Sequence, residues 1–196
     1  QCRSKFFDAN EYITKRFNAP FGSARNLEDD SSNLDNDVYV QLPISKEFYQ
    51  VKGSGKRKRT EKVASDATIN SIVDELADGE ILVMMAPFGA GKSLTTKEIF
   101  RRIISEYKRS KVSIVPIALN LREHWGQEYS DEILERHSRS IGFKPKEDLV
   151  VAWRAGMSCL LLDGFDEVAS QVIVSRDDKN FMRDARYQAL TGIREF

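Results

Sequence analysis

The feature that most constrains this chain is the stretch at residues 81–93, ILVMMAPFGAGKS. A run of apolar residues leads into a turn of small residues, the turn ends in Gly91-Lys92-Ser93, and a helical pattern follows directly. We expect a buried strand, a tight loop and a helix N-terminus, which is the context in which a Gly-Lys-Ser tripeptide binds phosphate. The stretch therefore predicts an α/β fold class.

Each residue type in this turn has a physical role in holding phosphate. Gly89 and Gly91 allow the backbone to curl so that its N–H groups point inward, and the new helix adds unpaired N–H groups and a positive dipole end. Lys92 would reach the terminal phosphates, and the Ser93 hydroxyl would bind magnesium. Ala86 stands where such loops usually have their first glycine. The alternative, a chance glycine-rich turn, is disfavoured because strand, loop and helix follow in register. The expected nucleotide-binding residues are Pro87, Phe88, Gly89, Ala90, Gly91, Lys92, Ser93 and Leu94.

A second apolar run ends in acidic residues at 159–167, CLLLDGFDE. We expect a parallel strand, buried on both faces, that places Asp163 at its carboxyl end. Asp163 would hold Mg²⁺ opposite Ser93, and the catalytic candidates Asp166 and Glu167 would orient or deprotonate a water aimed at the terminal phosphate. A strand ending in a solvated acidic loop is the simpler alternative. The upstream Gly-Lys-Ser turn makes that alternative less favourable.

The segment between the two motifs predicts a strand at 111–119 followed by a loop at 120–126. In an open parallel sheet, loops after the carboxyl ends of strands face the ligand crevice, so Arg122 and His124 are candidates for the rim of the site. For Arg122, an ion pair with a nearby glutamate is an equal alternative. For His124, a packed loop residue is the better interpretation.

The remaining segments predict helices and connections. Helical patterns are expected near 6–17, from Ser65 or Asp66 to Asp78, after Ser93, from Ser130 to Ile141, from 144–146 to Gly156, and at 181–196. Residues 37–43 predict a short extended segment, either a surface strand or a lid over a nucleotide base. The glycine-, serine- and lysine-rich residues 52–62 predict a flexible, solvated linker.

Composition excludes several partner classes. Lys plus Arg equals Asp plus Glu at 30 each, so net charge does not indicate a polyanion partner. The basic run at 56–59 has no interleaved aromatic residues, so nucleic-acid binding is not supported, although a localisation signal stays open. No apolar run approaches membrane-spanning length. Of the two cysteines, Cys2 and Cys159, the second lies in an apolar run and is expected to be a reduced core thiol, in keeping with a reducing compartment.

Together the two motifs resemble the NACHT clade of STAND nucleotidases. The likeness depends on residues 86–93, APFGAGKS, and 160–167, LLLDGFDE. Residues 116–123, PIALNLRE, are similar to the clade's second strand and following loop, and 39–43, YVQLP, to a segment upstream of the phosphate loop. The likeness covers about residues 37–196. The first motif alone would indicate only a P-loop NTPase, and the second motif narrows the resemblance to the NACHT type.

This resemblance implies a three-layer P-loop NTPase fold with a mostly parallel sheet, incomplete at its C-terminal side. The implied domains are an N-terminal extension at 1–36, a short strand with a basic linker at 37–62, and the N-terminal part of a NACHT domain at 63–196. The family's sheet has a further strand between the phosphate-loop strand and the strand that ends at Asp163.

The resemblance also implies a function. It suggests a cytoplasmic switch that binds ATP or ADP with Mg²⁺, hydrolyses ATP slowly and couples sensing to homo-oligomer assembly, in innate immunity or defence against phage. The trigger ligand and the effector domain are not identified. An ordinary P-loop ATPase or kinase is one alternative. A non-hydrolysing nucleotide-bound scaffold is another, and the presence of Asp166 and Glu167 makes it somewhat less favoured. A GTPase is disfavoured because the chain lacks an Asn-Lys-x-Asp motif.

Overall fold

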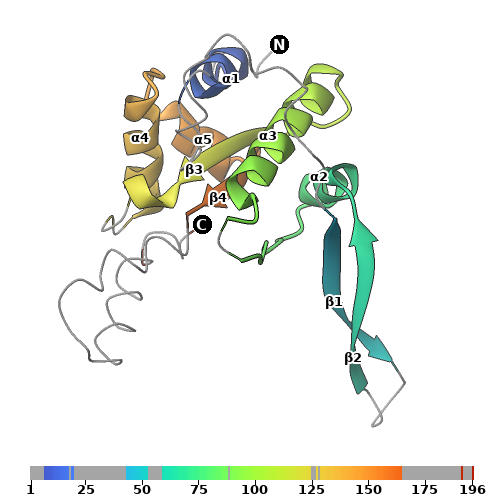
Figure 1. The fold of residues 1–196 in the computed structure, drawn as a ribbon. Helices are drawn as coiled ribbons and strands as arrows, with labels where there is room; N and C mark the ends of the chain where they lie inside the picture. The colour runs from blue at the N-terminus through green and yellow to red at the C-terminus, as the bar shows by residue number, and fades with distance from the viewer. Residues whose placement is uncertain are drawn as a thin grey trace, which may run out of the picture.

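The computed structural model describes residues 7–17, 19, 43–52, 59–87, 89–124, 127, 129–164, 191 and 196. These residues form a mixed α/β arrangement with two small sheets (Figure 1). One sheet is the parallel pair β3 (Val115–Asn120) and β4 (Ser158–Asp163), with helices packed around it. The other is the antiparallel hairpin of β1 (Ile44–Lys52) and β2 (Arg59–Ala67), which extends away from the helices (Figure 1). In the described part of the chain, no helix has the length and apolar character needed to cross a membrane.

The parallel pair places the ends of its two strands side by side. Val115 pairs with Ser158 at one end of the register, and Asn120 pairs with Asp163 at the other. β3 is buried along nearly its whole length, whereas in β4 only Leu161 is buried and Leu162 is 37% exposed. The expectation that the second strand is buried on both faces is therefore wrong for the described residues, because β3 is its one described partner strand.

Helix α3 (Lys92–Lys108) is the longest described helix and packs against both strands of the parallel pair. Its apolar residues recur at helical spacing, and the face they form is buried at Ile99, Phe100, Ile103 and Ile104. The prediction of a helix directly after the Gly-Lys-Ser turn is confirmed.

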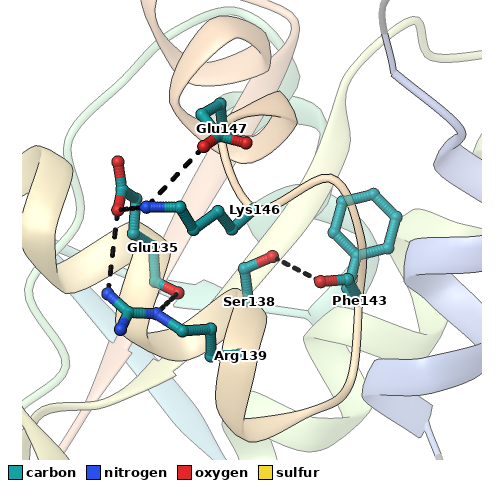
Figure 2. Close-up of polar contacts among 6 residues, drawn as sticks. All are labelled: Glu135, Ser138, Arg139, Phe143, Lys146 and Glu147. Atoms are coloured by element: carbon teal, nitrogen blue, oxygen red, sulfur yellow. Dashed lines mark hydrogen bonds and ion pairs between the residues drawn. The ribbon is translucent and has the colours of Figure 1, made fainter.

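Helix α4 (Ser130–Ser140) begins where predicted, with two acidic residues in its first turn that complement the helix dipole. Helix α5 (Asp148–Arg154) begins later than the predicted start at 144–146. Polar contacts join α4 to the connection before α5 (Figure 2). Lys146 Nζ lies 2.5 Å from Glu135 Oε2, and the Ser138 hydroxyl donates to the Phe143 carbonyl at 3.0 Å. The connection is held by these contacts instead of by another helical turn.

Helix α1 (Ala9–Phe17) docks onto α4 and β3 through a fully buried polar cluster. The Tyr12 hydroxyl lies 3.3 Å from His137 Nε2, and Arg16 donates from Nε to the Ala118 carbonyl at 2.9 Å. Tyr12 also makes an edge contact with Phe143, at 5.6 Å between ring centroids. The helix expected near 6–17 is thus present and is part of the core.

The β1–β2 hairpin differs from the expectation for its region. Residues 37–42 of the predicted extended segment lie outside the described residues, and the strand begins at Ile44 instead. The predicted linker at 52–62 is wrong for residue 52, which ends β1, and for residues 59–62, which belong to β2 and pair with β1. Residues 53–58 lie outside the described residues. β2 also includes Ser65 and Asp66, so neither caps the helix that follows. That helix, α2 (Ile69–Ala77), is capped by Thr68, whose hydroxyl accepts from the Ser71 amide.

Residues 81–87 form no strand, although the apolar run predicted a buried one. Ile81, Val83 and Met85 are more than 80% exposed, while Leu82 and Met84 are 36–39% exposed. Side chains therefore alternate as in an extended chain, but neither described sheet includes this segment. A strand needs a partner for its backbone N–H and C=O groups, so the apolar pattern alone does not produce one.

Candidate phosphate-binding site

The turn before α3 has the backbone geometry that its glycines predict. Gly91 is the N-cap of the helix and has φ +84°, a left-handed conformation that favours glycine. Gly89 has φ +78°, and no atom lies within 4 Å of where its Cβ would stand. The Ala90 amide donates to the Pro87 carbonyl at 3.3 Å, which closes the turn. The chain thus curls immediately before the helix, although no strand precedes it.

The N-terminus of α3 contains no negative charge of its own. Its N-cap residue, Gly91, provides no side-chain hydrogen bond, and its first turn contains no acidic residue. The first N–H groups of an α-helix have no partner within the helix, so together with the dipole they favour an anion. Leu94, the last predicted nucleotide-binding residue, is 39% exposed in this first turn.

Lys92 lies folded back over the turn. Its ammonium donates to the carbonyls of Ala86 at 3.0 Å and Pro87 at 3.3 Å. The side chain is therefore held against the same backbone that a phosphate would approach. An incoming phosphate would compete with these two carbonyls for the lysine.

The second predicted motif is described as far as Gly164. Asp163 is the last residue of β4 and is half-buried, and α3, which begins with Lys92 and Ser93, packs against this strand. Phe88, Asp166 and Glu167 lie outside the described residues. The described part of the chain contains no cluster of three or more His, Cys, Asp or Glu side chains that could hold a metal. Ser93 and Asp163 would thus be two oxygen ligands, a set that suits Mg²⁺ when phosphates and water supply the others.

The two rim candidates from the loop after β3 differ in burial: Arg122 is exposed and His124 is buried. The loop begins with a 3-10 turn, η3 (Leu121–Glu123), in which Arg122 is exposed. His124 is 1% exposed and lies beside His137, with 5.9 Å between ring centroids. Burial, together with the positive charge of Arg136, lowers the His124 pKa to about 4. His124 is therefore a packed, neutral core residue, as the preferred interpretation predicted.

One polar residue at this end of the sheet was missed in the sequence. Asn120 ends β3 opposite Asp163, and its side chain accepts from the Arg122 amide and donates to Glu123, both at 3.2 Å. The available signal was a polar residue that ends an apolar strand, in the same position as Asp163 in its own strand. Asn120 was expected in the loop at 120–126, whereas it is the last residue of β3.

Comparison with known proteins adds no relative: no family model, no curated protein and no solved structure matches this chain.

Proposed function

We propose that this chain binds ATP with Mg²⁺ at the turn before α3 and acts as a slowly hydrolysing nucleotide switch of the NACHT type. The observation that supports this most directly is the left-handed Gly91 at the start of an uncapped helix whose first residue is Lys92. Backbone N–H groups and the lysine would bind the phosphates, and Ser93 with Asp163 would hold Mg²⁺. Bound Mg²⁺ would neutralise charge that develops on the phosphates during transfer.

The arrangement of the apolar segment supports the same proposal. In the sheet that the resemblance implies, a further strand separates the segment before the phosphate loop from the strand that ends at Asp163. Residues 81–85 and β4 are not paired with each other in the structure, and residues 81–85 are the most exposed apolar stretch described. In the proposed sheet, the further strand would pair with residues 81–85 and lie between them and β4.

The proposed switch assembles into a homo-oligomer when it is triggered, and we propose a role in innate immune or anti-phage signalling. In phosphoryl-transfer enzymes an arginine supplied by a partner accelerates the reaction by about 10³–10⁵. An isolated subunit should therefore turn over slowly, and its specific activity should rise with protein concentration. A fast, concentration-independent ATPase would contradict the switch and favour an ordinary P-loop ATPase.

Equilibrium binding of labelled ATP and GTP, with and without Mg²⁺, tests the proposal. Lys92→Ala should abolish ATP binding, whereas Lys108→Ala, a control at the far end of the same helix, should bind as the wild type does. Asp166→Asn should bind ATP without hydrolysing it. If the wild type binds no nucleotide, or if Lys92→Ala binds as tightly as Lys108→Ala, the proposal is wrong. Bound ATP that never turns over in the wild type would instead favour the scaffold.

A further inference from the structure

We propose that Asn120 is a positioning residue that fixes the turn after Asp163 and thereby aims the Asp163 carboxylate. This inference rests on the proposed function, because it assigns Asp163 to a magnesium site. Asn120 and Asp163 end neighbouring parallel strands and are directly opposite each other in the register. The Asn120 side chain at the end of β3 is therefore placed beside the backbone at the end of β4.

Two hydrogen bonds hold the Asn120 side chain in one orientation. Its Oδ1 accepts from the Arg122 amide at 3.2 Å, and its Nδ2 donates to Glu123 Oε1 at 3.2 Å. An asparagine that bonds to the backbone two residues later stabilises a tight turn, and here it caps η3. The carboxamide is thus locked by the loop that follows β3.

The residue after Asp163, Gly164, leaves no room for a side chain beside this carboxamide. Gly164 has φ +84°, and a Cβ added there would stand 3.1 Å from Asn120 Oδ1. That Cβ would also lie 3.8 Å from the Arg122 amide nitrogen. Glycine is therefore required for both its conformation and its close approach. The Asn120 carboxamide therefore limits the position of the Gly164 backbone, directly after Asp163.

This contact has a direct consequence for metal binding. A carboxylate that ligates a metal binds well only when its surroundings hold it in the required orientation, and loss of such a supporting group typically costs about 10–100-fold in metal affinity. Asn120 itself need not touch nucleotide or metal. Its removal should therefore weaken the Mg²⁺-dependent part of ATP binding and leave the metal-free part unchanged.

The test measures ATP affinity with and without Mg²⁺ for the wild type, Asn120→Ala and Val115→Ala. Val115 is a buried residue at the other end of β3, so its truncation destabilises the same strand away from the site. In Asn120→Ala we expect the Mg²⁺-dependent gain in affinity to fall by about tenfold or more, with metal-free affinity within about twofold of the wild type. In Val115→Ala the gain should stay at the wild-type value.

A second readout needs no nucleotide. Asn120→Ala should accelerate hydrogen exchange of the Arg122 amide, which loses its acceptor, while amides in the middle of β3 stay protected. Gly164→Ala should cause the same loss of Mg²⁺-dependent affinity, because its new Cβ would press against the Asn120 carboxamide. The double variant should lose less than the two single losses combined, because removal of the carboxamide relieves the 3.1 Å contact.

The outcomes separate this inference from the proposed function. If the wild type binds no ATP, the proposed function fails and the role of Asn120 fails with it. If the wild type binds Mg²⁺–ATP and Asn120→Ala keeps the full Mg²⁺-dependent gain, only the positioning role is overturned. An equal loss in Val115→Ala would also overturn it, because the effect would then be general destabilisation of β3.

Discussion

Lowering the pH from 7.5 to 5.5 should destabilise this protein through the histidine pair beneath α1. His124 is 1% exposed and His137 is 3% exposed. Neither ring nitrogen of His124 has a described hydrogen-bond partner, and His137 faces the Tyr12 hydroxyl. Besides burial, Arg136 lowers the pKa of His124 and Arg16 lowers the pKa of His137, and both are cations. An imidazolium in this place would be desolvated and repelled.

The sign and size of the effect follow from the pKa shifts. Burial lowers the His124 pKa to about 4 and the His137 pKa well below its ordinary value. The unfolded chain therefore takes up protons first, so this stability is present above pH 6.5 and is lost as the pH falls towards 4. With an unfolded pKa of about 6.5, His124 alone should cost about 1.4 kcal/mol at pH 5.5 and about 3 kcal/mol below pH 4. His137 adds to the loss.

Urea-induced unfolding at pH 7.5 and 5.5 measures this loss. The chain contains only two histidines, so few other side chains titrate in this interval. His124→Gln removes one titrating group and should recover about 1 kcal/mol of the difference between the two pH values. NMR titration provides a check that does not depend on a variant folding, since the imidazole signals of the folded protein should not shift above about pH 5. Equal stability at both pH values, or ordinary histidine titration near pH 6.5, would refute the reasoning.

Three further changes test the packing and the helix ends. Ile103→Ala should lower the free energy of unfolding by about 2–5 kcal/mol in chemical denaturation, because Ile103 is fully buried in α3; a loss below 1 kcal/mol would mean that this face is not core. Thr68→Ala should cost about 1 kcal/mol by thermal unfolding, since the Ser71 amide loses its acceptor, and Thr68→Ser should restore most of it. Lys146→Ala should leave the midpoint of chemical denaturation almost unchanged despite its short contact with Glu135, because the pair is partly solvated; a large loss of stability that persists in high salt would contradict this.

What could be predicted from the sequence is mainly what depends on local interactions. α3 follows from apolar residues at helical spacing, and its start follows from a glycine that adopts positive φ just before Lys92. β3 and β4 were also predicted, because continuous apolar runs favour parallel strands. The packing of His124 was predicted from its position beside Trp125. Each of these features is specified within a few residues of the chain.

What could not be predicted depends on partners distant in sequence. The hairpin was missed because its second strand, RTEKVASDA, is polar and has no alternating apolar face; it forms by pairing with β1. Arg16 has no local signal either, since only the tertiary structure brings α1 against the Ala118 carbonyl. Asn120 does have a local signal, a polar residue at the end of an apolar strand, but its importance depends on its register with Asp163.

Residues 81–93 show both kinds of dependence within one motif. The turn and the start of α3 form as predicted, although the strand that should support them is not formed. Three of the preceding apolar side chains are more than 80% exposed, and burying each would contribute about 1.5–3 kcal/mol. The curled turn and the start of α3 therefore require only local backbone conformations, whereas the expected strand before them requires a partner strand. Lys92 lies against the Ala86 and Pro87 carbonyls, at the junction between these two parts. A strand that pairs with residues 81–85 should thus alter affinity at the proposed nucleotide site through Lys92, without touching the nucleotide.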